Sequence, residues 1–155
     1  MLAETVAIRQ AVEDDLDTII AMFADDALGG HGDTTEPEAR ADYLAAFRRI
    51  AASANETLYV AVLDGEVVGT FQAMLTTAMP GRGGTSMIIE AVQTRADRRG
   101  LGIGAAMIAH AVAQARVRGV RQVQLTSNAT RKDAHRFYER LGFSASHIGF
   151  KLKLK

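Results

Sequence analysis

A glycine-rich stretch at residues 98–105 constrains this chain more than any other feature. It reads Arg-Arg-Gly-Leu-Gly-Ile-Gly-Ala and follows an apolar, β-branched segment at 87–92. The periodic apolar residues after it, at positions 101, 105, 108, 112 and 115, predict a helix over 101–118 that ends at Gly119. Glycine lets backbone N–H groups approach a ligand closely, and a helix N-terminus offers unpaired donors and partial positive charge. The stretch therefore predicts a phosphate or pyrophosphate site between a strand and a helix.

The spacing of the glycines separates the known phosphate-binding loops. A P-loop ends in Gly-Lys-Ser/Thr, whereas Gly104 is followed by two alanines. A Rossmann loop needs Gly-x-Gly-x-x-Gly/Ala, and the third small residue is missing after Gly102 and Gly104. The pattern that fits is Arg99-x-x-Gly102-x-Gly104, which resembles the acetyl-CoA pyrophosphate loop of the GNAT superfamily of N-acetyltransferases.

Two further segments carry the same resemblance. Residues 128–143, which include Phe137-Tyr138 and Leu-Gly-Phe, resemble the late helix of the family. Residues 59–62 and 64–69, with Asp-Gly between two apolar runs, resemble its central hairpin. The resemblance covers about residues 57 to 150 and is identified from loop, hairpin and tyrosine-bearing helix in this order.

The composition narrows the class of protein. The 155 residues are 48% hydrophobic and 23% charged, which predicts one globular domain over residues 1–155. Lys+Arg and Asp+Glu number 18 each, and this balance argues against binding to nucleic acid or to an anionic membrane. The absence of cysteine excludes disulfides and a covalent cysteine mechanism. No metal-binding pattern, membrane span or signal peptide is apparent, so we expect a cytoplasmic protein without a metal.

The hydrophobic pattern predicts a mixed α/β fold. Strands are expected at 5–9, 57–63, 66–76, 85–94 and 120–127, with one or two more in 143–154, and helices after Asp15, after Pro37, over 101–118 and over 130–141. Loops are expected at 28–35 and 80–84. The unit 85–127 requires a parallel strand pair, and the hairpins are antiparallel. The result is a mainly antiparallel sheet with helices on both faces. The resemblance implies that strands 85–94 and 120–127 splay apart and admit the pantetheine arm between them.

Acetyl transfer to an amine needs a base for the ammonium proton, donors for the oxyanion and an acid for the leaving thiolate. Glu90 is the only carboxylate of its strand and matches an acidic position often seen in the family. The resemblance therefore implies that Glu90 is the general base that accepts the ammonium proton. Period-two alternation puts it on the same side as Val92 and Thr94. Tyr138 matches the tyrosine that points at the sulfur and is the expected acid. The alternatives are a salt-bridged or solvated Glu90 and a Tyr138 that only packs.

The resemblance also implies the groups that bind the two substrates. The exposed backbone of Ala91–Thr94 is the expected oxyanion donor, and the planar guanidinium groups of arginine suit phosphates. Asn128 either binds pantetheine or caps a helix. The expected acetyl-CoA contacts are Val92, Thr94, Arg98, Arg99, Gly100, Leu101, Gly102, Ile103, Gly104, Ala105 and Asn128. For the acceptor amine we expect Glu90 together with His31 and His147.

These features predict an acetyl-CoA-dependent N-acetyltransferase that acetylates a primary amine of a small molecule by direct attack in a ternary complex. The alternatives are a protein or peptide N-acetyltransferase and a non-catalytic acyl-CoA-binding module. The final strand, if exposed, could pair across a homodimer.

Overall fold

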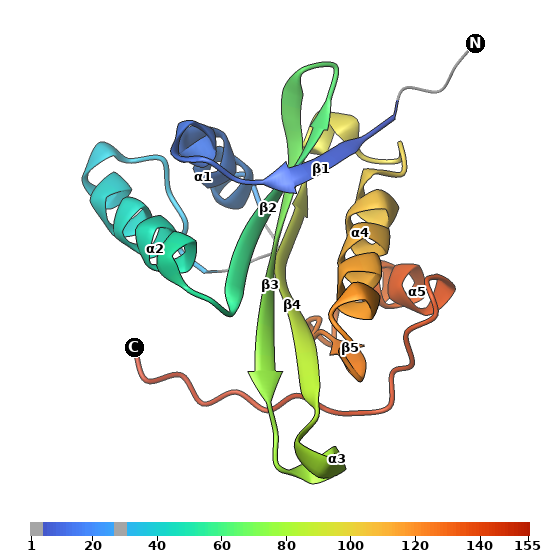
Figure 1. Ribbon diagram of the computed structural model, residues 1–155. Coiled ribbons are helices and arrows are strands. Elements are labelled where there is room, and N and C mark those ends of the chain that lie inside the picture. The colour runs from blue at the N-terminus through green and yellow to red at the C-terminus, as the bar shows by residue number, and fades with distance from the viewer. Residues whose placement is uncertain (1–4, 27–30) are drawn as a thin grey trace.

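A computed structural model describes residues 5–26 and 31–155 (Figure 1). Its centre is a five-stranded sheet in the order β1-β2-β3-β4-β5. The strands are β1 (Ala7–Gln10), β2 (Glu56–Leu63), β3 (Glu66–Thr77), β4 (Thr85–Thr94) and β5 (Gln122–Gln124). The first four are antiparallel neighbours, and β5 pairs with β4 in parallel.

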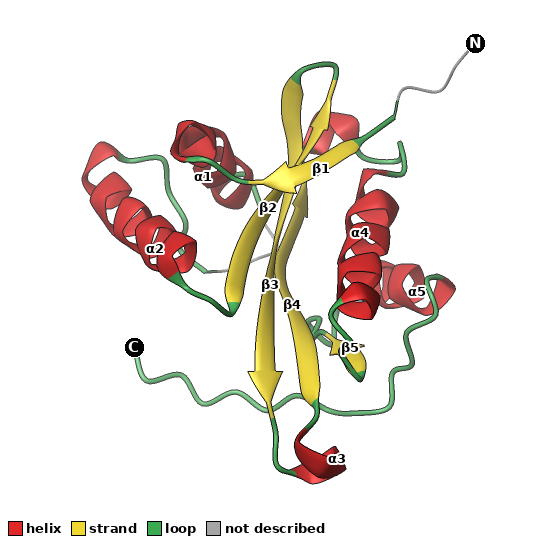
Figure 2. Cartoon of the chain, in the orientation of Figure 1, coloured by secondary structure: helices red, strands yellow, loops and turns green. Residues whose placement is uncertain are grey.

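Helices cover both faces of this sheet (Figure 2). They are α1 (Leu16–Ala24), α2 (Arg40–Ala52), α4 (Ile103–Val117) and α5 (Lys132–Arg140), while the short α3 (Pro80–Gly83) lies in the turn between β3 and β4. Helices α1 and α2 lie on one face, and α4 and α5 lie on the other. The predicted mixed, mainly antiparallel sheet with one parallel pair and helices on both faces is confirmed.

Strand alternation divides the core into two layers. In β2, Val60 packs against α1 and α2, while its neighbour Ala61 packs against α4, and both are fully buried. Helix α4 contributes one apolar face to the core layer on its side of the sheet. The buried residues of this face are Ile103, Met107, Ile108, Ala111 and Ala115. Burying a side chain such as Ile108 contributes about 1.5–3 kcal/mol. The buried face differs from the expected one at 101, 105, 108, 112 and 115. The helix begins at Ile103, so Leu101 lies in the loop before it and is 58% exposed.

Two sequence-based expectations about strands were wrong. The strand expected over 120–127 is paired only at Gln122–Gln124, opposite Ser86–Ile88, and beyond this point β4 and β5 separate. The final strands expected in 143–154 do not form: residues 144–155 are all described and contain no strand, because no neighbouring strand pairs with them. Of the loop expected at 28–35, residues 28–30 lie outside the described part of the chain.

An ion pair holds the end of β1 to the start of α1. Asp15 is 7% exposed and accepts hydrogen bonds from both terminal nitrogens of Arg9, at 2.7 and 3.0 Å. It also accepts the backbone N–H of Val12 at 2.8 Å. The hydrogen bond from Arg9, more than any other cause, lowers the pKa of Asp15. The ionised carboxylate therefore stabilises the fold.

We predict that Asp15→Asn lowers the free energy of unfolding near neutral pH by about 1–3 kcal/mol. The folded pKa of Asp15 lies below its unfolded value of about 3.9, so the stabilisation is present above this value and is lost as the pH falls. Urea unfolding at several pH values should show the difference between variant and wild type shrinking below about pH 4. Asp17→Asn is the matched control, because Asp17 pairs with Arg40 at the surface and should change little. A difference that stays constant with pH would contradict this role.

Candidate active site

Strand β4 contains an irregularity at its centre. Ala91 has φ of +54°, a left-handed conformation that is uncommon for a residue with a Cβ. The pairing with β3 skips one residue between Glu90 and Gln93, so Ala91 and Val92 together lie opposite Phe71. This is a β-bulge, which bends the strand and leaves one residue without its ladder partner. The bulge therefore provides backbone groups that are available to a ligand.

The bulge decides which way the side chains of β4 point. Glu90 lies opposite Gln72, on the face covered by α1 and α2. Val92 packs into the layer under α4, and Thr94 lies opposite Gly69 on that same face. The expectation that Glu90 shares a side with Val92 and Thr94 was wrong, because one inserted residue reverses the alternation.

A second carboxylate lies on the Glu90 face. Gln93 follows the bulge on this face and donates a hydrogen bond to Asp26 Oδ2 at 2.6 Å. Asp26 comes just after α1, so this bond joins the end of that helix to β4. Glu90 itself is exposed. Two acidic side chains on one face favour a positively charged ligand.

A buried hydroxyl group without a hydrogen-bond partner follows β5 in the chain. Parallel pairing stops at Ile88 and Gln124, and three residues further along lies Ser127. Its Oγ is buried and has no hydrogen-bond partner. A buried polar group without a hydrogen-bond partner is destabilising, and a ligand bound beside Ser127 could supply that partner. The sequence analysis missed Ser127, because a serine in a polar stretch carries no signal until its burial is known.

The start of α4 has the geometry expected for an anion site. Gly100 and Gly102 both have left-handed φ, of +79° and +82°, which glycine adopts readily. Gly102 is the N-cap, and the first helical hydrogen bond runs from Ala106 N–H to its carbonyl at 3.0 Å. The N–H groups of residues 103–105 therefore have no partner within the helix. They form a set of backbone donors at the positive end of the helix dipole.

Gly104 has a different task from Gly102. A Cβ on Gly104 would lie 3.2 Å from Cζ of Phe137, whereas a Cβ on Gly102 would meet nothing within 4 Å. Gly104 thus allows α5 to pack closely on the first turn of α4. Ile103 is 1% exposed, so its side chain belongs to the core and only its backbone faces a ligand.

The two predicted phosphate-binding arginines differ in environment. Arg98 donates a hydrogen bond to Glu66 Oε2 at 3.2 Å, and Arg95 donates to the same oxygen at 3.1 Å. Arg99 is exposed. A phosphate at the start of α4 would compete with Glu66 for Arg98, and Arg99 is the more accessible of the two predicted contacts.

Tyr138 lies on α5, beside α4, on the sheet face opposite Glu90. Its ring meets those of Phe137 and Phe143 edge-on, with centroids 5.1 and 5.9 Å away. Burial raises the pKa of Tyr138, and the charge of Arg131 offsets this only in part. The hydroxyl is therefore protonated at neutral pH and can act as a donor.

The remaining predicted residues lie in turns or at the surface. Asn128 Oδ1 accepts the N–H of Thr130 at 2.9 Å and its hydroxyl at 2.7 Å in the turn before α5. It does not cap that helix, whose N-cap residue is Arg131 and has no side-chain capping hydrogen bond. His135, to which the sequence assigned no role, forms a 2.8 Å hydrogen bond through Nε2 with the Asn128 carbonyl. His31 and His147 are both exposed and lie in separate segments.

Comparison with known proteins decides the family. The model of the acetyltransferase (GNAT) family matches residues 16–143, which is most of the chain. The chain belongs to the GNAT family of acetyltransferases. Over 91 residues it is 35% identical to aminoalkylphosphonate N-acetyltransferase of Salmonella typhimurium strain LT2. That match covers 59% of this chain and 58% of the relative, so the chain spans less than two thirds of the relative's length.

Solved structures share the fold of this chain. A transcriptional regulator from Bacillus halodurans C-125 has a TM-score of 0.92 and 39% identity, over 97% of this chain and 100% of its own. An aminoglycoside N-acetyltransferase in complex with CoA has a TM-score of 0.77 and shares the fold at 17% identity, over 99% of this chain and 98% of its own. The family model thus places the chain in the acetyltransferase (GNAT) family, and the curated relative is named as an N-acetyltransferase.

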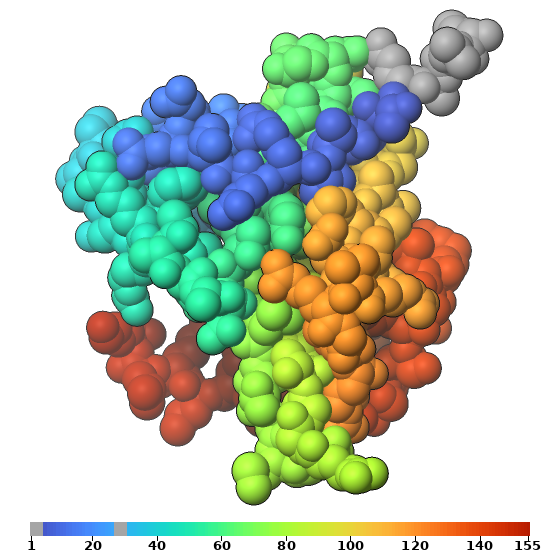
Figure 3. All heavy atoms as spheres, viewed as in Figure 1, coloured from blue at the N-terminus to red at the C-terminus, as the bar shows by residue number. Residues whose placement is uncertain are grey.

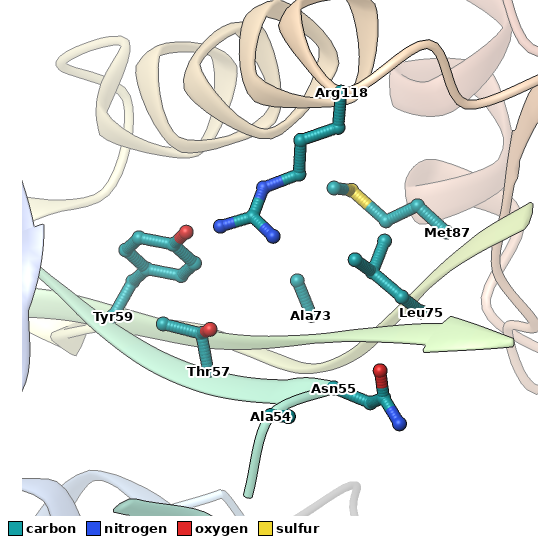
Figure 4. A pocket seen from close by; sticks show the side chains of 8 residues that line it. All are labelled: Ala54, Asn55, Thr57, Tyr59, Ala73, Leu75, Met87 and Arg118. Carbon is teal, nitrogen blue, oxygen red and sulfur yellow. The ribbon is translucent and has the colours of Figure 1, made fainter.

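A shallow hollow on this GNAT domain lies away from the predicted site (Figure 4). It is on the α4 face, at the far end of that helix from Gly102, and the guanidinium of Arg118 points over it. Its lining consists of Ala54, Asn55, Thr57, Tyr59, Ala73, Leu75, Met87 and Arg118. None of the residues predicted for catalysis or for acetyl-CoA lines it.

Two searches of the described residues were negative. Residues 5–26 and 31–155 contain no group of three or more His, Cys, Asp or Glu side chains placed to hold a metal ion. Within the same residues, no helix combines the length and the apolar character needed to cross a membrane.

Proposed function

We propose that this GNAT protein transfers the acetyl group of acetyl-CoA to a primary amine of a small molecule, by direct attack in a ternary complex. The observation that carries the proposal is that α4 begins, with its unpaired N–H donors, after the carboxyl end of β4, while the unsatisfied Ser127 Oγ follows the carboxyl end of the parallel strand β5. Because β4 and β5 are parallel, their carboxyl ends point toward the same edge of the sheet.

We assign protein groups to the pyrophosphate, the pantetheine arm and the thioester of acetyl-CoA in turn. The N–H groups of residues 103–105 and the guanidinium of Arg99 suit the pyrophosphate. Ser127 Oγ suits a polar group of the pantetheine arm. The thioester then lies beside the bulge, where a backbone N–H of residues 91–94 stabilises the oxyanion.

The two proton transfers of the reaction take place on opposite faces of the sheet in this proposal. On the Glu90 face, the acceptor ammonium loses a proton to Glu90 directly or through water, and its nitrogen attacks the thioester carbonyl carbon. The C–S bond breaks, Tyr138 gives its proton to the leaving sulfur from the α4 face, and the attacking nitrogen loses its second proton to solvent, so that free CoA and the neutral amide are the products. Glu90 then releases its proton to solvent, and Tyr138 regains one from solvent. Because base and acid approach the gap from opposite sides, the attacking and leaving groups do not compete for space.

The acceptor class is proposed from charge and from the curated relative. Glu90 and Asp26 give the acceptor face a negative character suited to an ammonium group. The relative is named for acetylation of an aminoalkylphosphonate, a small molecule with an amine. His31 and His147 are proposed contacts for the remainder of the acceptor.

We predict that Gly102→Asp abolishes acetyl-CoA binding in a folded protein. The new carboxylate would repel the phosphates at the helix start, and its Cβ would oppose the left-handed φ. Calorimetric titration measures the affinity. Gly119→Asp is the matched control, since Gly119 also has a positive φ, of +68°, and open space around its Cβ, but lies at the other end of α4. Equal binding by both variants would refute the assigned loop.

For Tyr138→Phe we expect kcat to fall roughly 10²–10⁴-fold, with little change in acetyl-CoA affinity. Only the proton for the leaving thiolate is lost, while the ring keeps its contacts with Phe137 and Phe143. The measurement is steady-state turnover with an alkylamine panel, combined with calorimetry. Phe143→Leu serves as a packing control. If kcat is unchanged while chemistry limits the rate, Tyr138 has only a packing role.

For Glu90→Gln the pH dependence of the rate should change shape. The amide keeps the size of the side chain but accepts no proton, so the variant loses rate near neutral pH. It should recover at high pH, where bulk water has already deprotonated the amine. Gln72→Glu, which places a carboxylate on the opposed strand, tests whether a displaced base restores activity. A profile that is reduced by the same factor at every pH would assign Glu90 to acceptor binding instead.

A further inference from the structure

The lysines of this chain are unevenly distributed. The sequence has 14 arginines but only four lysines, and three of the four stand at alternate positions over 151–155. Of these two side chains, only lysine can become a nucleophilic amine, because the guanidinium group of arginine stays protonated. Apart from Lys132, every side-chain primary amine of the chain therefore lies in one short segment.

The segment that carries these lysines is exposed and unattached. Residues 144–155 are all exposed, and among the described residues no backbone hydrogen bond joins them to the remainder of the chain. The side-chain hydrogen bond between Ser146 Oγ and His147 Nδ1, at 2.7 Å, lies within the segment itself. A segment with so few contacts costs little free energy to move. Its lysines can therefore enter a site close to their present position.

The course of the segment brings it to the site of acetyl transfer. It leaves α5 on one side of the sheet and ends on the side of α2 (Figures 1 and 3). On the way it passes the chain after β5, because a Cβ on Gly149 would lie 3.7 Å from Cγ2 of Thr126. Thr126 precedes Ser127, to which the pantetheine arm is assigned. Continued for three residues, the parallel register of β4 and β5 sets Ser127 level with the bulge at Ala91.

Reach and charge both favour the lysines as acceptors. Lys151 follows Gly149 by two residues, which span about 7 Å in an extended chain, and its four-carbon stem reaches further. The segment runs toward the face of the sheet that carries Glu90 and Asp26, whose charges attract an ammonium group. The lysine side chain is an unbranched primary alkylamine, which is the acceptor class of the proposed function.

We propose that the enzyme acetylates its own lysines at 151, 153 and 155, within the same chain. The ammonium group of the lysine gives one proton to Glu90, and Nζ attacks the thioester carbonyl carbon. The C–S bond breaks, Tyr138 protonates the sulfur, and Nζ loses its second proton to solvent, so that CoA and acetyl-lysine are the products. Each transfer removes one positive charge from the segment. This inference rests on the proposed function, because it uses the same site.

The first test follows a deuterated acetyl group from acetyl-CoA into the protein by peptide mass spectrometry. Label should enter 151–155 roughly 10²-fold faster than Lys132, which lies on α5 away from Glu90 and reacts only by the uncatalysed route. Gly102→Asp, with its repelling carboxylate at the anion site, should lose this selective label. Equal rates at Lys132 and at 151–155, or the same selective label in Gly102→Asp, would overturn the proposal.

The second test asks whether the transfer stays within one molecule. Heavy-isotope-labelled Gly102→Asp protein is mixed with wild type and acetyl-CoA, so that the two chains differ in mass. Only the wild-type chain should gain acetyl groups, and its rate per molecule should not change on dilution. Acetylation of the heavy chain, or a rate that falls on dilution, would mean transfer between molecules and would overturn the arrangement proposed.

A third measurement separates this inference from the proposed function. Lys151→Arg, Lys153→Arg and Lys155→Arg, combined in one variant, keep the charge and remove the acceptors. This variant should take up no label over 151–155 and should acetylate an alkylamine panel as the wild type does. A wild type that acetylates the amines but not its own lysines overturns the inference and leaves the proposed function standing. A wild type that acetylates neither overturns both.

Discussion

The β-bulge at Ala91 is the constraint on which the arrangement of the site depends. One inserted residue opposite Phe71 turns Glu90 toward α1 and α2 and leaves Val92 and Thr94 under α4. It lies just beyond the last residue of β4 that pairs with β5, where the two strands separate. The left-handed φ of Ala91 is unfavourable for a residue with a Cβ, and the register of β3 on either side holds it in place. Without the bulge, β4 would present a regular ladder and no free backbone group at this point.

The packing of α4 against α5 links the anion site to Tyr138. Gly102 shapes the loop before α4, while Gly104, two residues later, admits the ring of Phe137. Phe137 precedes Tyr138, so the contact that brings the helices together also sets the position of the hydroxyl. A side chain at Gly104 would push on Phe137 and displace Tyr138 without touching a phosphate. The glycine motif therefore serves both ligand approach and helix packing.

The segment after α5, residues 144–155, is a place where the local sequence pattern and the structure differ. Alternation of apolar residues with lysines over 148–155 predicts a strand, yet these residues form none. A strand exists only through hydrogen bonds to a neighbour, and the neighbour is not encoded in the segment itself. Asn128 gives the same lesson at smaller scale, since pantetheine binding and helix capping were equally consistent with the sequence, whereas the side chain closes a local turn with Thr130 and the N-cap of α5 is Arg131.

The sequence by itself determined the elements, the mixed sheet and the family, because these follow from short-range periodicity, turn residues and a glycine spacing that few loops share. The Asp64-Gly65 hairpin and the start of α4 near Gly102 are of this kind. Only the tertiary structure decided the side on which Glu90 lies, the burial of Ser127 and the pairing of Arg98 with Glu66. Each of these depends on a contact with a strand or loop distant in the sequence, and a single-residue shift in register reverses the outcome.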